Sequence, residues 1–175
     1  MQDVLAKAAQ IKLMIFDVDG VLTDGGLIMD KEGHEYKKFN SRDGHGMKML
    51  QETGVDIAII TGRSSDVVGH RMAGLGVKHV YQGQEDKRVA FLQLLKDLDL
   101  KPEEVAYMGD DVIDLPVMRK VGFATAVADA HPLVKKHAHW QSPSEGGCGA
   151  ARDVCELIMD AQGHLVDQMA RYLED

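Results

Sequence analysis

Short apolar runs alternate along the chain with longer stretches in which apolar residues recur every three or four positions. Each short run ends in polar or glycine-rich sequence, which is typical of buried parallel strands. The runs lie at residues 11–16, 55–60, 77–81, 105–108 and 123–127. Because the segments between them have helical spacing, the alternation predicts an α/β fold with a doubly wound parallel sheet.

The apolar residues with helical spacing define the expected helices. Between the runs they are Met47 and Leu50; Val67, Val68, Met72 and Leu75; Val89, Leu92, Leu95 and Leu98; and Leu115 and Met118. Helical spacing returns from residue 150 to residue 172, with Gly163 as the expected break. We therefore expect a helix after each of the first four strands and a helical tail.

Two segments depart from the alternation. Residues about 25–40 contain an apolar triplet, a polar Asp-Lys-Glu-Gly turn and a second extended stretch, which together predict a β-hairpin flap. The C-terminal tail, residues about 145–175, begins with a glycine-rich stretch. At 175 residues the chain can bury one sizeable core, so we expect a single domain spanning 1–175.

The net charge and the composition limit which classes of partner and which cellular compartment are expected. The formal net charge of -8 argues against nucleic acid or an anionic membrane surface as the main partner. A small phosphorylated substrate is compatible with it, because a bound cation and a few basic residues can reverse the charge locally. Cys148 and Cys155 lack CxxC spacing, so free thiols are expected. With neither a signal-like N-terminus nor a run of roughly 18 apolar residues, we expect a cytoplasmic protein.

Polar residues that follow the strands form a coherent chemical set. In an open parallel sheet, ligands bind beyond the carboxyl ends of the strands. These residues are Asp17 and Asp19 after the first run; Thr61, Gly62 and Arg63 after the second; Lys87 in the helix after the third; and Asp110, Asp111 and Asp114 after the fourth. Carboxylates from two strand ends suit Mg²⁺, and a hydroxyl and an ammonium bind phosphate oxygens.

The order of these residues resembles the four motifs of the haloacid dehalogenase superfamily. In that superfamily DxD, a Thr or Ser, a Lys and a paired-acid motif follow one another along a Rossmann-like sheet. The chain carries DVDGVLTDG, TGR, Lys87 and GDDxxD in the same order. DxD alone would be weak evidence, since acidic pairs at strand ends are common, but the combination is specific.

The resemblance implies a phosphatase mechanism. Asp17 would attack phosphorus, with Mg²⁺ held by Asp17, the backbone carbonyl of Asp19 and Asp110. Asp19 would protonate the leaving oxygen and then activate water. The remaining motif residues would assist: Thr61 and Lys87 by holding the transferring oxygens, and Asp111 and Asp114 by orienting the metal, its waters or Lys87.

The spacing of the motifs leaves no room for an inserted cap domain. The residues between Asp19 and Thr61 are expected to form only the hairpin and one helix. An uncapped site would be open to water, so closure by another chain is expected, which implies a homo-oligomer.

This capless pattern resembles the 3-deoxy-D-manno-octulosonate 8-phosphate phosphatases of bacterial lipopolysaccharide synthesis. The matching stretches span nearly the whole chain and include SRDGHGMKML, GDDVIDLPVM, AVADAHPLVK and EGGCGAARDV. In that family the subunits form a tetramer with the hairpins around its centre, and the glycine-rich segment can reach a neighbour's active site. The resemblance implies a magnesium-dependent phosphomonoesterase that acts on a small acidic sugar phosphate.

Several residues are candidates for binding that substrate. Guanidinium groups pair with carboxylates in a bidentate fork, which favours the arginines. Arg63 also departs from the related nine-carbon sugar acid phosphatases, which tend to carry an acidic residue after Thr-Gly. The candidates are Thr23, Arg42, Gly62, Arg63 and Arg152.

Each assignment has a structural alternative. Asp19 could cap the turn at Gly20, Thr61 could be an ordinary helix N-terminal residue, and Lys87 could be solvated. Asp114 could be only an N-cap for the helix that follows. The arginines at 42 and 152 could form surface or subunit-interface salt bridges.

Parts of this pattern also fit functions other than a phosphatase. A phosphoacceptor signalling domain also uses acids, a Thr and a Lys on a doubly wound sheet, but its acceptor aspartate lies on the third strand. An inactive scaffold and a phosphotransferase acting through the same aspartyl phosphate are further alternatives, as is a phosphatase for a nine-carbon sugar acid. The sequence leaves the length of the sugar open.

Overall fold

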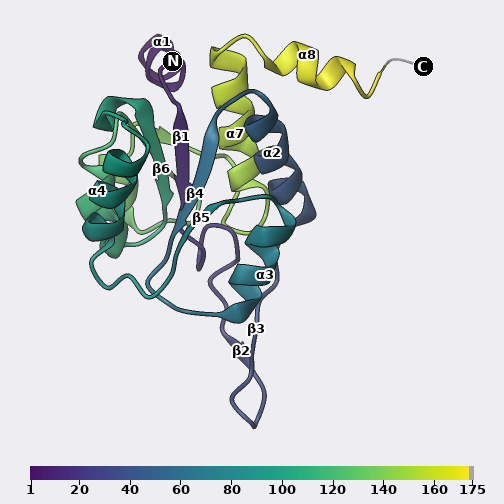
Figure 1. Ribbon diagram of the computed structural model, residues 1–175, viewed down its shortest axis with the longest axis vertical. Coiled ribbons are helices and arrows are strands. Elements are labelled where there is room, and N and C mark those ends of the chain that lie inside the picture. Colours follow the sequence, from purple (N-terminus) through teal and green to yellow (C-terminus); the bar gives the residue numbers. More distant parts are fainter. Residues whose placement is uncertain (174–175) are drawn as a thin grey trace.

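The central sheet contains six parallel strands in the order β5-β4-β1-β6-β7-β8 (Figure 1). A computed structural model describes residues 1–173 of the chain. The strands are β1 (Leu13–Phe16), β4 (Asp56–Ile60), β5 (His79–Tyr81), β6 (Val105–Gly109), β7 (Phe123–Ala126) and β8 (Trp140–Gln141). All five apolar runs contain a strand, which confirms the predicted parallel sheet. The edge strand β8 was not predicted, because two residues are too few to show a period.

Helices cover both faces of the sheet (Figure 1). On one face, α2 (Ser41–Glu52) packs against α7 (Ala150–Ala161); α4 (Lys87–Asp97) lies on the other face, beside α5 (Leu115–Met118). The other helices are α1 (Gln2–Ala8), α3 (Asp66–Gly74), α6 (Pro132–His137) and α8 (Leu165–Ala170), with 3₁₀ turns at Pro102–Glu104 and Val112–Asp114. The doubly wound α/β prediction is therefore confirmed. No helix within residues 1–173 is long and apolar enough to cross a membrane.

The buried face of α4 differs from the predicted one. Val89 and Leu92 are 64% and 54% exposed, whereas Ala90, Phe91 and Leu94 are buried. The helix begins at Lys87, whose side chain is itself buried, and this sets the rotation of the helix. The predicted face was based on apolar residues alone, so it did not take an inward-facing lysine into account.

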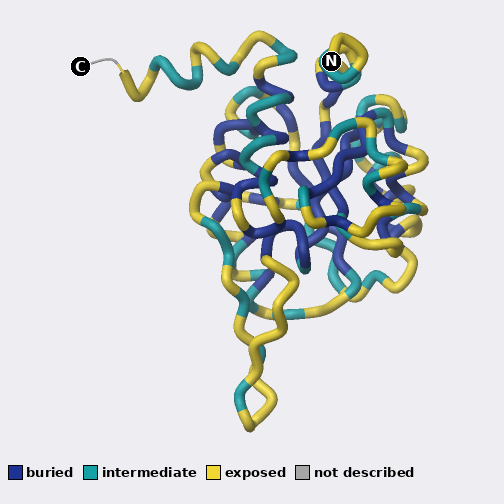
Figure 2. Tube along the Cα trace, turned by 180° about the vertical axis from the view of Figure 1, so that it is seen from behind, coloured by how far each residue is buried: buried dark blue, intermediate teal, exposed yellow. Residues whose placement is uncertain are grey.

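A β-hairpin projects from the edge of the sheet where the strands end (Figure 1). Its strands are β2 (Ile28–Met29) and β3 (Glu35–Tyr36), and most of its length is exposed (Figure 2). The described chain between β1 and β4 adds only this hairpin and α2, which confirms the expected flap and the absence of a cap domain.

A carboxylate from α2 caps the start of α7. The residue before α7, Gly149, has no side chain to cap the helix. Asp43 takes this role, because its Oδ1 accepts a hydrogen bond of 2.9 Å from the backbone N–H of Arg152. Since unpaired N–H groups at a helix start need an acceptor, this contact fixes α7 and the glycine-rich residues that precede it.

Candidate active site

A pocket of about 200 Å³ lies at the carboxyl ends of β1, β4 and β6. This is the edge at which a parallel sheet of this topology binds ligands. Most of the predicted motif residues meet there. The lining residues are Asp17, Asp19, Thr61, Gly62, Arg63, Asp110, Asp111 and Ile113.

Lys87 lies beneath this pocket with its side chain almost fully buried. Its Nζ is 2.9 Å from Oδ1 of Asp17 and 2.7 Å from Oδ1 of Asp114. It also donates a hydrogen bond of 3.2 Å to the hydroxyl of Tyr107. A buried ammonium requires partners of this kind. The alternative that Lys87 is a solvated residue at the start of a helix is therefore wrong.

Asp114 accepts hydrogen bonds with both of its carboxylate oxygens. Its Oδ1 accepts hydrogen bonds from Lys87 and from the hydroxyl of Tyr107, each of 2.7 Å. Its Oδ2 accepts hydrogen bonds of 3.0 and 3.2 Å from the backbone N–H groups of Asp110 and Asp111. The Asp114 side chain makes no capping hydrogen bond to α5, so it is not merely the N-cap of that helix.

The carboxylates of Asp17 and Asp110 suit a divalent cation. Oxygens of Asp17, Asp110 and Asp114 lie within 4.8 Å of one another. Asp114 uses both oxygens for protein hydrogen bonds. Oδ1 of Asp17 is paired with the ammonium of Lys87, whereas Oδ1 of Asp110 is buried and accepts no hydrogen bond from the described residues. Carboxylate oxygens are the ligands that Mg²⁺ prefers, so the clustered acids with the unpartnered oxygen of Asp110 fit this ion. The Asp19 carboxylate lies outside the cluster, which leaves its backbone carbonyl as the predicted ligand.

Burial and mutual repulsion make these acids hard to ionise. Burial, and then the charge of Asp114, raises the pKa of Asp17 to about 6, against the opposing charge of Lys87. Burial, and then the charges of Asp114 and Asp17, raises the pKa of Asp110 to about 8. A bound cation would favour the ionised carboxylates and displace their protons.

We predict that the metal-free protein loses stability as pH rises from about 4 to about 8. In this window the folded state keeps protons on Asp17 and Asp110 that the unfolded state has released, so the free energy of unfolding falls with pH. Mg²⁺ should therefore raise the melting temperature more at about pH 8 than at about pH 5. Thermal unfolding with Mg²⁺ and with a chelator measures this, and Asp110→Asn should flatten the profile. A chelated protein that became more stable over the same window would contradict it.

The loop after β1 is held between Asp110 and the glycine-rich segment. Gly20 has a φ of +91°, and a Cβ at this position would overlap the carboxylate of Asp110. On the other side, a Cβ on Gly146 would overlap the carbonyl oxygen of Gly20, and the N–H of Gly147 donates to the carbonyl of Val21. The glycine-rich segment therefore contacts the loop after β1 of its own chain.

Thr23 is not placed where a substrate-binding residue was predicted. It is buried, and its Oγ1 accepts from the N–H of Gly25 at 3.2 Å and from that of Gly20 at 3.4 Å. The same hydroxyl donates to the carbonyl of Val18. Because the hydroxyl is engaged with the loop itself, Thr23 shapes the loop and does not line the pocket.

Two of the predicted arginines also lie outside the pocket. Arg152 is on α7 and forms an ion pair with Glu156, one turn along the same helix. Arg42 lies in the first turn of α2 and is exposed. Within one chain, therefore, the structure brings only Arg63 of the three to the substrate pocket.

Sequence reasoning missed three polar residues around the site. Tyr107 lies inside β6, where its ring looks like an ordinary core residue, and its hydroxyl reaches Lys87 and Asp114. Glu35 and Lys37 come from the end of the hairpin, and Lys37 forms an ion pair with Asp19. Their spacing of two residues on an extended segment was the available signal, since it places both side chains on one face.

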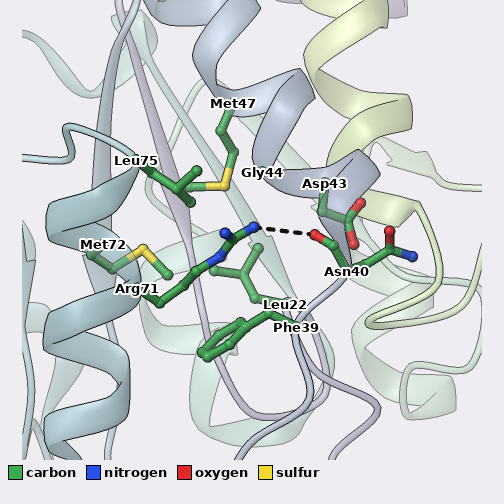
Figure 3. Close-up of a pocket in the computed structure, with 9 residues that line it drawn as sticks. All are labelled: Leu22, Phe39, Asn40, Asp43, Gly44, Met47, Arg71, Met72 and Leu75. Atoms are coloured by element: carbon green, nitrogen blue, oxygen red, sulfur yellow. Dashed lines mark hydrogen bonds between the residues drawn. The ribbon is translucent and has the colours of Figure 1, made fainter.

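A second hollow, between α2 and α3, is too small to be a substrate site (Figure 3). Its volume is about 10 Å³, which is at most space for one water molecule. The Arg71 guanidinium lies 5.9 Å from the ring centroid of Phe39 and donates to the carbonyl of Asn40. In turn the Asn40 side chain donates to the carbonyl of Gly147. These contacts anchor the end of the hairpin to the glycine-rich segment.

Comparison with known proteins agrees with this geometry. A family model of haloacid dehalogenase-like hydrolases matches residues 76–152. The 3-deoxy-D-manno-octulosonate 8-phosphate phosphatase KdsC of Escherichia coli (strain K12) is 52% identical over 163 residues, covering 93% of this chain and 87% of that protein.

Solved structures of similar proteins share the fold. The phosphatase of the same name from Yersinia pestis has a TM-score of 0.93 at 51% identity, covering 94% of this chain and 89% of that one. The one from Moraxella catarrhalis, in complex with a magnesium ion, a phosphate ion and a KDO molecule, has a TM-score of 0.96 at 41% identity, covering 98% and 99%. With half of its residues identical to KdsC over nearly its whole length, the chain belongs to the 3-deoxy-D-manno-octulosonate 8-phosphate phosphatase family of haloacid dehalogenase-like hydrolases.

Proposed function

We propose that the protein is a magnesium-dependent phosphatase that hydrolyses 3-deoxy-D-manno-octulosonate 8-phosphate to the free sugar acid and phosphate, a step of lipopolysaccharide precursor synthesis. The observation that carries the proposal is the buried, unpartnered Oδ1 of Asp110, which lies in one cluster with the carboxylate of Asp17, itself paired with the ammonium of Lys87. Relatives at this identity are named for the same reaction. Mg²⁺ would be held by Asp17, Asp110 and the backbone carbonyl of Asp19, and would offset the repulsion between the nucleophile and the phosphate.

In the first step, the Asp17 carboxylate attacks phosphorus and the bond to the sugar oxygen breaks. Asp19 donates its proton to the departing oxygen, which leaves as the sugar hydroxyl. Thr61 and Lys87 bind the phosphoryl oxygens as charge shifts among them. Asp114 keeps Lys87 in place through the hydrogen bond of 2.7 Å.

In the second step, water attacks the phosphorus of the aspartyl phosphate. Asp19, now ionised, accepts a proton from this water, and Asp17 is regenerated as phosphate leaves. One residue thus serves as acid and then as base. Asp19 suits this work because it lines the pocket and its side chain is partly exposed, so both the leaving oxygen and water can reach it.

The acidic end of the substrate would meet Arg63. Its side chain is 48% exposed and lines the pocket, with Nη2 donating to Glu35 at 3.0 Å. A guanidinium can exchange this partner for a substrate carboxylate at little cost, since both contacts are charge-assisted. Gly62 beside it leaves room for the sugar.

Phosphate release from a panel of sugar phosphates tests the proposal. The panel includes the eight-carbon and nine-carbon 2-keto-3-deoxy acid phosphates and a neutral sugar phosphate, each assayed with Mg²⁺ and with a chelator. We expect turnover only with Mg²⁺ and the highest kcat/KM for the eight-carbon acid. Preference for the nine-carbon acid would reassign the substrate. Failure to hydrolyse any member would contradict the proposal.

The protein is proposed to act as a homo-oligomer in the cytoplasm, with a tetramer as the expected form. Four large apolar side chains of the hairpin are each more than half exposed in the single chain. They are Leu27, Ile28, Met29 and Tyr36. Their exposure supports the proposal that other copies of the chain cover the hairpin. Cys148 and Cys155 are free thiols, as is usual in a reducing compartment. Sedimentation of the wild-type protein and of a Met29→Glu variant tests the oligomer.

A further inference from the structure

A buried ammonium outside the four motifs lies beside the predicted acid. The side chain of Lys37 is only 2% exposed. Lysine is almost never buried to this extent unless its charge is paired. Its Nζ forms one ion pair with Oδ1 of Asp19 and a second, of 3.1 Å, with Oε1 of Glu35. The residue follows β3 directly, so the hairpin returns its charge to the loop after β1.

Glu35 holds Lys37 through the second ion pair. The same Oε1 that accepts from Lys37 also accepts from Nη2 of Arg63 at 3.0 Å. One carboxylate oxygen therefore joins the hairpin to the residue that follows Thr61 and Gly62. Lys37 is thus held between two acids, and its position does not depend on Asp19 alone.

The Asp19 carboxylate depends on Lys37 for its orientation. Besides Lys37 on Oδ1, its ion-pair partner in the described chain is Nε of Arg63, which is 3.9 Å from Oδ2. A contact of that length is too long for a hydrogen bond and constrains direction weakly. Asp19 also precedes a glycine in the left-handed region, so the backbone adds little restraint on its side chain.

We propose that Lys37 is a positioning residue for the reaction: held by Glu35, its ammonium sets the Asp19 carboxyl group against the leaving oxygen of the substrate. The inference rests on the proposed phosphatase function. The two ion pairs of Lys37 join Asp19 to Glu35 of the hairpin, so the hairpin limits how the Asp19 carboxyl group can turn. In this proposal the hairpin contributes to the chemical step through Lys37.

Two substrates with different leaving groups test this role. A sugar phosphate releases an alkoxide and needs a proton from Asp19, whereas p-nitrophenyl phosphate releases a stable phenolate without one. The first-turnover rate is measured for each substrate, because Asp19 also acts as the base in the second step, which both substrates share. With Lys37→Met, this rate should fall on the order of 10²-fold for the sugar phosphate with little change in KM, while the first-turnover release of p-nitrophenolate changes by less than about threefold. Lys37→Arg should recover part of the loss, because it restores the charge.

Matched variants separate positioning from other roles. Lys38→Met changes the neighbouring lysine, which is exposed and paired with Asp24, and should leave both rates unchanged. Glu35→Gln keeps the Lys37 ammonium but weakens its anchor, so it should give the same selective loss in a smaller form. If Lys37→Met does not fold, Glu35→Gln tests the positioning role in its place.

The possible results lead to distinct conclusions. An equal loss with both substrates would overturn the proposal, because Lys37 would then support the fold. A raised KM with unchanged kcat would also overturn it, since Lys37 would then bind substrate. If the wild-type enzyme does not hydrolyse the eight-carbon acid phosphate, the proposed substrate fails. The same variant comparison would then be made with whichever alkyl phosphate it does hydrolyse.

Discussion

Asp17→Asn is expected to abolish turnover, with a fall in kcat on the order of 10⁴-fold or more. An amide is a poor nucleophile and cannot form the aspartyl phosphate, so no other group in the pocket completes the first step. The variant should fold, because asparagine has the same shape and removes one of three mutually repelling acids. Phosphate release from the sugar phosphate measures the loss, and Asp17→Ala guards against deamidation of the asparagine.

Asp160→Asn is the matched control for this prediction. Asp160 is exposed in the last turn of α7, away from the pocket, so the same chemical change should leave kcat unaltered. Acid quenching during turnover should trap phosphate on the peptide that contains residue 17 in the wild-type protein and in Asp160→Asn. Wild-type activity in Asp17→Asn would refute the mechanism.

Lys87→Met should damage both stability and activity. The side chain of Lys87 is 1% exposed and is the cation between Asp17 and Asp114. Methionine fills the space but leaves buried carboxylates without their partner, which costs about 3 to 5 kcal/mol in the free energy of unfolding. The loss of an ammonium at the phosphoryl oxygens should also lower kcat by 10²- to 10³-fold, roughly. Urea unfolding and phosphate release measure the two effects.

The next residue supplies the control. Arg88 is half-exposed and pairs with Asp86 at the surface, so Arg88→Met should change stability little. Mg²⁺ should recover part of the stability of Lys87→Met, because a divalent cation can neutralise the same acids. Equal behaviour of the two variants would contradict the assignment of Lys87 as a buried structural cation.

The sheet could be predicted from the sequence because its strands are buried on both faces. Such strands appear as continuous apolar runs, and all five runs proved to contain strands. The face of α4 could not be predicted, because a lysine lies on its inward side. The strand β8 was missed for a different reason: it pairs along only two residues, which leaves no periodic signal.

The site residues that directly follow strand ends could be predicted from the sequence. Residues whose positions depend on tertiary contacts were harder to predict. Asp17, Thr61 and Asp110 meet because parallel strands end at one edge. The burial of Thr23 and the distance of Arg152 from the pocket depend on how the loop and α7 pack, which no local pattern records. Lys37 reaches Asp19 only because the hairpin folds back over the loop.

Because β1 lies in the middle of the sheet, its pairing depends on strands that are synthesised after it. Its neighbours in the sheet, β4 and β6, are both synthesised later, and the loop after it rests on Gly146. On the ribosome, β1 therefore emerges with unpaired backbone groups on both sides and waits for most of the chain. The nucleophile therefore precedes in the chain most of the residues that complete its site.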